Sequence, residues 1–86
     1  MVRYYTDKDE AGNKYYYKDP KKTIRHRTDG PAVERWSGTK VWYANNIIHR
    51  MDGPAVEYQD GIGWWYINGV IIFETNSVGV LAYRQS

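Results

Sequence analysis

The sequence predicts an all-β fold: a single antiparallel meander sheet built from tandem β-hairpin repeats, with atypical units capping both ends. Three observations predict it. A shift of 23 residues places 24–46 on 47–69 with 13 identical positions, so the chain repeats one structural unit. The segments between turn signals are rich in β-branched and aromatic residues, which favour strands. Paired Asn and Gly residues recur between these segments at the same place in each unit.

The first unit is degenerate. "GNKYYYKDPKKTIRHR" (12–27) aligns with "GTKVWYANNIIHR" (38–50) once three extra residues are allowed after Tyr17. We therefore divide one domain, 1–86, into a degenerate unit (1–23), two full repeats (24–46 and 47–69) and a partial unit with a C-terminal cap (70–86).

Each full repeat contains two kinds of turn. Asn68-Gly69 lies between "WWYI" and "VIIF" and is the strongest short hairpin signal, because a type I′ turn needs positive φ at both central residues. Asn45-Asn46 holds the same place one unit earlier, and Asn also tolerates that conformation. Ser37-Gly38 and Asp60-Gly61 mark the bend at the other end.

The segment "HRTDGPAVE" (26–34) returns as "HRMDGPAVE" (49–57) and invites a catalytic reading. Each residue of the Asp-Gly-Pro-Ala box also has a backbone reason. Asp starts a turn, Gly supplies positive φ, Pro suits a strand start or a bulge, and Ala fits a crowded bend. We therefore expect the box to be structural. The predicted structural turn residues are Asp29, Gly30, Pro31, Asp52, Gly53, Pro54, Asn45, Asn46, Asn68 and Gly69.

The repeat also arranges aromatic residues in rows. Residues two strands apart lie about 10 Å apart on one face, so Tyr16, Trp42 and Trp65 should form one row. Their chain neighbours must point to the opposite face. We expect the Trp row to form the core and the second row to be partly exposed. That second row comprises Tyr17, Tyr43 and Tyr66.

The C-terminal segment 75–86 is ambiguous. Asn76 or Ser77 could cap a short helix, but Gly79 and Val80 disfavour one, and a last strand fits as well.

Composition excludes several classes of protein. There is no cysteine, so neither disulfides nor thiolate metal sites support the fold. No apolar run approaches the roughly 18–20 residues of a membrane span, and no signal peptide precedes Val2, so we expect a cytoplasmic protein. The net charge of +2 is uneven: residues 1–40 carry +4 and residues 41–86 carry −2.

The two histidines do not predict catalysis. His26 and His49 should lie about 10 Å apart, whereas metal ligands converge to within about 2.0–2.2 Å of one ion. No Ser or Cys nucleophile stands in the box. We expect no enzyme activity, metal or cofactor, and favour a cross-strand ladder in which His or Arg binds Asp29 and Asp52. A strip binding an acidic partner stays open.

The 23-residue unit resembles the MORN repeat and its bacterial and viral variants. The matching segments are "WYANNIIHRMDGPAVEYQDG" (42–61) and "WWYINGVII" (64–72), and the resemblance covers about 12–73. The "HRxDGPAVE" form is similar to a variant in proteins of bacteriophages and large DNA viruses. The chain departs where Pro and Ala replace the second glycine of the Gly-x-Gly strand. The resemblance implies a non-catalytic interaction or scaffold element, in some members with proposed membrane contact.

We expect a non-enzymatic protein–protein interaction module. The resemblance, with the small size of the chain, implies a phage protein that binds and inhibits or redirects a host or defence protein in the host cytoplasm. The alternative is a protein that sequesters a nucleotide or nucleic acid by Tyr stacking and Arg–phosphate contacts. Unpaired sheet edges would also allow homo-oligomers. The candidate binding residues are Arg25, His26, Arg27, His49, Arg50, Tyr17, Tyr43 and Tyr66.

Overall fold

The computed structural model describes residues 3–75 and 81–83, and within them every regular element is a strand. Eight strands form one antiparallel sheet in the order β1-β2-β3-β4-β7-β8-β9-β10, and β5 and β6 form a two-stranded sheet. The predicted all-β meander is therefore confirmed. The strands are β1 (Tyr5–Lys8), β2 (Lys14–Tyr17), β3 (Val33–Glu34), β4 (Lys40–Val41), β5 (Tyr43–Ala44), β6 (Ile47–Ile48), β7 (Val56–Glu57), β8 (Gly63–Ile67), β9 (Val70–Thr75) and β10 (Leu81–Tyr83).

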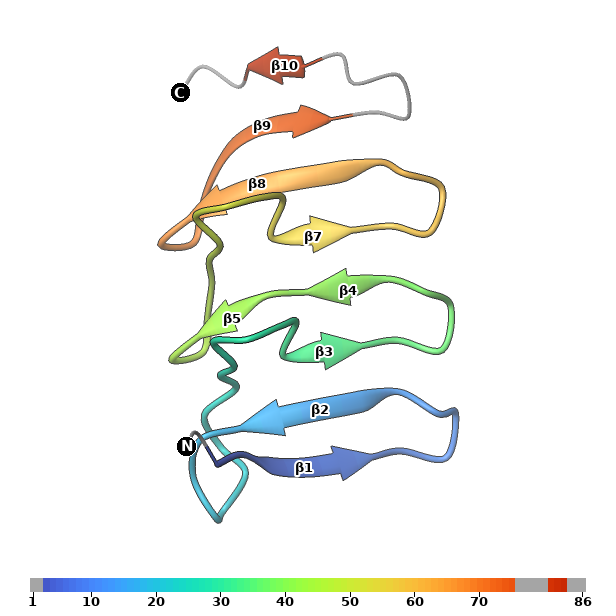
Figure 1. Ribbon diagram of the computed structural model, residues 1–86, viewed down its shortest axis with the longest axis vertical. Coiled ribbons are helices and arrows are strands. Elements are labelled where there is room, and N and C mark those ends of the chain that lie inside the picture. Colours follow the sequence, from blue (N-terminus) through green and yellow to red (C-terminus); the bar gives the residue numbers. More distant parts are fainter. Residues whose placement is uncertain (1–2, 76–80, 84–86) are drawn as a thin grey trace.

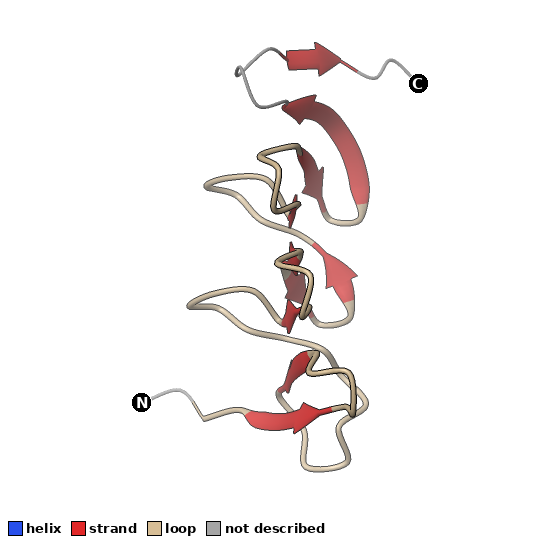
Figure 2. Ribbon diagram, turned by 90° about the vertical axis from the view of Figure 1, so that its right-hand side faces the viewer, coloured by secondary structure: helices blue, strands red, loops and turns tan. Residues whose placement is uncertain are grey.

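The hairpins stack one above another, with β1 at one end of the ladder and β10 at the other (Figure 1). Seen from the side, the strands follow one layer, and two loops project from it (Figure 2). The molecule measures 39 × 25 × 23 Å along its principal axes. This arrangement is typical of a repeat array, in which each unit contacts only its neighbours.

At one end of the strands, the same glycine turn occurs three times. Gly12, Gly38 and Gly61 have φ of 95°, 93° and 93°. Each glycine N–H donates to the carbonyl three residues earlier, at 3.1, 2.9 and 3.1 Å. A three-residue hairpin loop needs a left-handed residue at this place, and glycine adopts that conformation without strain. The turn at Gly12 has the geometry of the turns in the full repeats.

At the other end, both asparagine turns have positive φ at their two central residues, as predicted. The angles are 53° and 69° at Asn45 and Asn46, and 50° and 81° at Asn68 and Gly69. The second residue of each turn donates its N–H to an equivalent carbonyl of Arg25 or Ile48, at 2.8 Å in both cases.

The Asp-Gly-Pro box is an excursion from within a strand, which the sequence did not indicate. β6 pairs with β5 and β7 pairs with β4, so the two short strands share one nearly continuous partner. Between them, residues 49–55 leave the sheet and return. Residues 26–32 do the same, between the Tyr17–Arg25 bridge and β3. We call residues 26–32 the first box loop and residues 49–55 the second box loop.

The last unit has no such excursion. β9 pairs with β8 along its length, and only a one-residue register shift interrupts the ladder, opposite Trp65 and Tyr66. Phe73 stands 23 residues after Arg50 and stacks on Trp65 with ring centroids 4.8 Å apart. An aromatic residue thus replaces the arginine of the box where the array ends.

The aromatic row is not the core, contrary to prediction. The buried apolar residues among those described are Ala32, Val33 and Ala55, while the Trp row (Tyr16, Trp42 and Trp65) is only half-buried. A single-layered sheet has no second layer to cover large side chains. The two box alanines are buried because their loops fold back on the sheet.

For the ambiguous C-terminal segment, β10 pairs antiparallel with β9, in favour of a strand. Residues 76–80 and 84–86 lie outside the described residues. The described part of the chain contains no helix that is long and apolar enough to cross a membrane.

Candidate functional site

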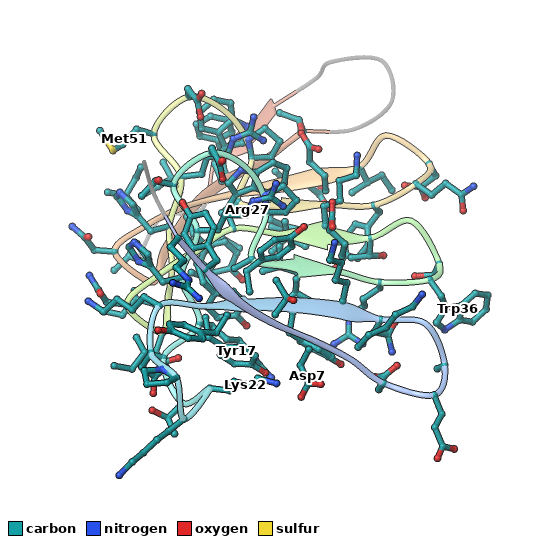
Figure 3. All side chains as sticks on the ribbon, turned by 60° about the horizontal axis from the view of Figure 1, so that its bottom comes forward. Asp7, Tyr17, Lys22, Arg27, Trp36 and Met51 are labelled. Atoms are coloured by element: carbon teal, nitrogen blue, oxygen red, sulfur yellow. The ribbon has the colours of Figure 1, made fainter. Side chains whose placement is uncertain are left out.

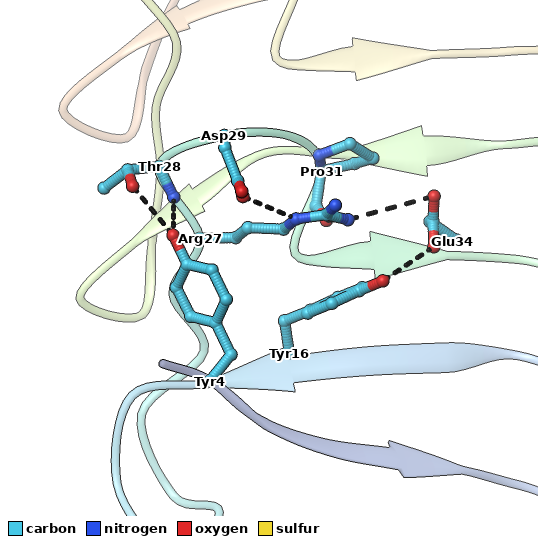
Figure 4. A network of polar contacts seen from close by, with 7 residues as sticks. All are labelled: Tyr4, Tyr16, Arg27, Thr28, Asp29, Pro31 and Glu34. Carbon is cyan, nitrogen blue, oxygen red and sulfur yellow. Dashed lines mark hydrogen bonds and ion pairs between the residues drawn. The ribbon is translucent and has the colours of Figure 1, made fainter. Parts of the chain in front are cut away.

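Each box loop is organised around the arginine at its second position, Arg27 or Arg50. In the first loop, Arg27 Nε donates to Asp29 Oδ1 at 2.9 Å and Nη1 donates to the carbonyl of Pro31 at 3.1 Å (Figure 4). Its guanidinium carbon lies 3.9 Å from the centroid of the Tyr16 ring, and Nη1 lies 4.0 Å from Glu34. The side chain is only 19% exposed. The contacts of Arg27 therefore hold the first box loop in its conformation.

The second loop repeats this arrangement with a closer contact to the glutamate. Arg50 Nε donates to Asp52 at 2.9 Å, and Nη1 donates to the Pro54 carbonyl at 3.0 Å and to Glu57 at 3.1 Å. The guanidinium carbon lies 3.9 Å from the centroid of the Trp42 ring. A planar guanidinium can stack and donate in several directions at once, which a lysine cannot do.

The box glycines are required for close approach. Gly30 and Gly53 do not have positive φ, contrary to our expectation. A Cβ at these positions would lie 2.9 Å from the guanidinium carbon of Arg27 or 2.7 Å from that of Arg50. Each guanidinium therefore fits between an aromatic ring and a bare glycine backbone.

The aspartates bind arginine, and the histidines bind the asparagine turns. The hydrogen bonds from Arg27 and Arg50 hold the pKa of Asp29 and Asp52 below the ordinary value. The predicted cross-strand ladder is therefore wrong, because each Arg–Asp pair joins residues two apart within one box loop. Neither histidine binds an aspartate among the described residues.

Each histidine instead accepts a backbone hydrogen bond at Nδ1. The donor is the N–H of Asn45 for His26, at 3.1 Å, and of Asn68 for His49, at 2.9 Å. An accepting Nδ1 places the proton of the neutral ring on Nε2. Burial, with a smaller contribution from Lys18, lowers the pKa of His26.

The charged side chains of the strands oppose one another across the sheet. Lys14 lies opposite Glu34, Glu34 opposite Lys40, and Lys40 opposite Glu57. Opposite charges in register stabilise neighbouring strands. Part of the excess of basic residues in 1–40 is thus matched by glutamates within the sheet.

The predicted tyrosine row is half-buried on the other face. Arg25 lies over two rings of that face, 5.3 Å from the centroid of Tyr15 and 5.7 Å from that of Tyr43. Tyr17 and Tyr66 belong to the same row. Arg25 is therefore separated from Arg27 and Arg50, with which the sequence grouped it.

A concavity lies between the two box loops. It has a volume of about 600 Å³ and is lined by residues 27–30 of the first loop, by Trp42 and Ala44 of the strand, and by residues 49–52. We call it the loop groove. Its exposed side chains include Met51, at 71%, and the carboxylates of Asp29 and Asp52, at 67% and 86%.

Comparisons of the chain with protein-family models, with curated proteins and with solved structures find no match. Among residues 3–75 and 81–83, no group of three or more His, Asp and Glu could hold a metal ion.

Sequence reasoning missed two residues of this region. Met51 is the one position at which "HRTDGPAVE" and "HRMDGPAVE" differ, so the comparison of the repeats could have indicated it. Tyr4 lies outside the aligned repeats and gave no signal. Met51 projects at the end of the strands opposite to Trp36, which is also exposed (Figure 3).

Proposed function

We propose that this protein is a non-enzymatic protein-binding module whose binding surface is centred on the loop groove. The observation that carries the proposal is the exposure of Met51, a large apolar side chain, beside two carboxylates in the loop groove. An apolar anchor point within a polar rim is the usual composition of a protein interface.

The same geometry argues against chemistry at the box. Arg27 and Arg50 are fixed by hydrogen bonds and by stacking, and His26 and His49 accept from the backbone. A general base must be free to reach the proton that it removes. The Nδ1 atom of each histidine already accepts a backbone hydrogen bond, so it is not available as a general base.

The charges of the groove suggest the chemistry of the partner. Its arginines are largely covered, at 19% and 20% exposure, whereas its carboxylates face solvent. An acidic partner would therefore meet carboxylates first. This favours an apolar or basic segment in the groove, in place of the acidic partner that the sequence left open.

Affinity capture tests this function. The resemblance to phage and viral repeats makes a bacterial lysate the first source, with a host protein as the expected target. Immobilised wild-type protein should retain a protein species that Met51→Glu fails to retain. Trp36→Glu, which places the same charge at the opposite end of the strands, should retain that species. Capture that Met51→Glu leaves unchanged, or that is absent, would contradict the proposal.

A second candidate, nucleotide or nucleic-acid binding, is favoured by Arg25 alone. This arginine lies over Tyr15 and Tyr43, and no ion pair is present for it among the described residues. Aromatic faces stack on bases, and arginine binds phosphate. If this candidate holds, a single-stranded oligonucleotide will bind in a salt-sensitive manner and Arg25→Ala will weaken the binding. Arg35→Ala is the matched control.

A further inference from the structure

The chain itself shows what fits beneath a box loop. Tyr4, which precedes β1, lies under the first box loop (Figure 4). Its hydroxyl accepts a hydrogen bond from the N–H of Thr28 at 2.9 Å and is 2.7 Å from the hydroxyl oxygen of the same residue. Its ring meets that of Tyr16 edge to face, with centroids 6.0 Å apart. One tyrosine side chain thus contacts the loop and the aromatic residue beside it.

The loop groove is the repeat-equivalent place beneath the second box loop. In the repeat register, Tyr16 corresponds to Trp42 and Thr28 corresponds to Met51. Both Trp42 and Met51 line the groove. In the first unit a tyrosine fills this space, and in the second unit a hollow of about 600 Å³ remains.

The backbone donor that Tyr4 uses is also unused in the second unit. The N–H of Thr28 donates to the Tyr4 hydroxyl, whereas the N–H of Met51 makes no hydrogen bond among the described residues. The second loop holds the same shape as the first, because Arg50 repeats each contact of Arg27. The donor is therefore fixed in place before any ligand binds.

We propose that the loop groove binds a tyrosine side chain of a protein partner, in the pose that Tyr4 adopts beneath the first box loop. The ring would pack edge to face against Trp42, and the phenol oxygen would accept from the N–H of Met51. This inference rests on the proposed protein-binding function and names the side chain that the groove would recognise.

The flanking groups define the specificity. Met51 has no hydroxyl to match that of Thr28, so the phenol proton would be donated to the second carboxylate oxygen of Asp52. Phenylalanine would keep the ring contact and lose both hydrogen bonds. Phosphotyrosine would bring a dianion between the exposed carboxylates of Asp29 and Asp52, which repel it. The groove should therefore select the unmodified phenol.

Small probes test this on the wild-type chain, without any substitution. N-acetyl-tyrosinamide is titrated into nitrogen-15-labelled protein, and amide and indole resonances are followed by NMR. We expect saturable shifts at the Met51 amide and the Trp42 indole. Loss of one neutral hydrogen bond and of one hydrogen bond to an ionised carboxylate should weaken the phenylalanine analogue about 30-fold or more. The O-phosphotyrosine analogue should produce no saturable shift.

Equal binding of the tyrosine and phenylalanine probes, or no saturable shift at Met51 and Trp42, would overturn the inference. Such a result is distinguishable from failure of the proposed function. If capture still depends on Met51, the groove binds a partner by other chemistry. If capture does not depend on Met51 but the tyrosine probe binds, the groove has the proposed specificity and the protein-binding function is not supported.

Discussion

At the scale of single residues, the contacts of Arg27 and Arg50 explain most of the residues that are identical between the two box loops. The guanidinium of Arg50 binds the carboxylate of Asp52, the carbonyl of Pro54 and the carboxylate of Glu57, and it packs between Trp42 and Gly53. Asp, Gly, Pro and Glu of the box are therefore the binding site of their own arginine. This is why the box recurs without being catalytic.

Substitution of Gly53 by alanine tests this packing. The new Cβ would lie 2.7 Å from the guanidinium carbon, and Arg50 cannot move without losing its polar contacts. We expect a loss of about 1–3 kcal/mol in the free energy of unfolding. Urea denaturation measures it.

A double-mutant cycle identifies the cause of that loss. In an Arg50→Ala background, the obstructing side chain is absent, so Gly53→Ala should cost much less. An equal cost in both backgrounds would show that the glycine is needed for another reason.

The stability of the protein should depend on the protonation of His26. Burial lowers its pKa in the folded state, so the unfolded chain takes up this proton at a higher pH than the folded chain does. The contribution of neutral His26 to the free energy of unfolding is then fully present above the ordinary histidine pKa of about 6.5. It is lost as the pH falls from there through the folded-state pKa. The urea midpoint should accordingly be lower at pH 5.5 than at pH 7.5.

His26→Asn is the matched variant, because its amide oxygen occupies the place of Nδ1 and can accept from the N–H of Asn45 but does not titrate. Its midpoint should change less over the same interval. Asp9, Asp19, Asp29 and Asp52 have pKa values lowered from the ordinary value of 3.8 by hydrogen bonds, so they titrate below this range. A wild-type midpoint that is constant or rises as the pH falls would refute the assignment.

At the scale of elements, each full unit is a hairpin in which one strand is interrupted by a box loop. The excursion brings an arginine onto the aromatic residue of the preceding strand. Where the box is missing, β9 runs on with a single bulge, and Phe73 stacks on Trp65 in the register of the arginines. An end unit that closes with an aromatic residue is a simple cap for the array.

The asparagine turn of the first full repeat has an additional role. Asn46 accepts from the N–H of Arg25 at 2.7 Å and donates to the carbonyl of Thr23 at 2.9 Å. These bonds brace the loop that carries the three extra residues of the first unit. They explain why Asn stands where the next repeat has Gly69.

We therefore expect Asn46→Gly to destabilise the protein by roughly 0.5–1 kcal/mol, although glycine suits its φ of 69°. Asn45→Gly, at a φ of 53°, removes no side-chain hydrogen bond and should be nearly neutral. Thermal unfolding of the two variants side by side checks the difference. Equal effects would show that the bracing bonds contribute nothing.

At the scale of the whole molecule, the repeat register predicted the strands and the asparagine and glycine turns between them, while the choice between helix and strand for 75–86 stayed open. These features depend on local sequence: Asn68-Gly69 and Gly38 favour a turn through their own backbone conformation, whatever surrounds them. The excursions depend on which strands pair across the box, and hydrophobic pattern does not encode that. The core prediction failed because it assumed a second layer, which a one-layer array lacks.

The candidate site was predicted only in part. The repeated box and its histidine and arginine residues were singled out from the sequence. The arginines, which were candidate binding residues, are largely covered, and the groove between the box loops was not predicted. The tyrosine contact of the first loop could not have been found, because Tyr4 is remote in sequence and has no repeat partner. Only the folded arrangement places it beneath Thr28.

The number of tyrosine-binding sites tests the central claim most directly. Tyr4→Ala should empty the place beneath the first box loop and so create a second site like the loop groove. NMR titration with N-acetyl-tyrosinamide should then show two sites in Tyr4→Ala, with a new shift at the Thr28 amide, and one site in the wild type. Tyr4→Leu is a second variant that removes the phenol with less loss of packing. A folded Tyr4 variant in which the Thr28 amide does not respond would contradict the claim that box loops are tyrosine-binding elements.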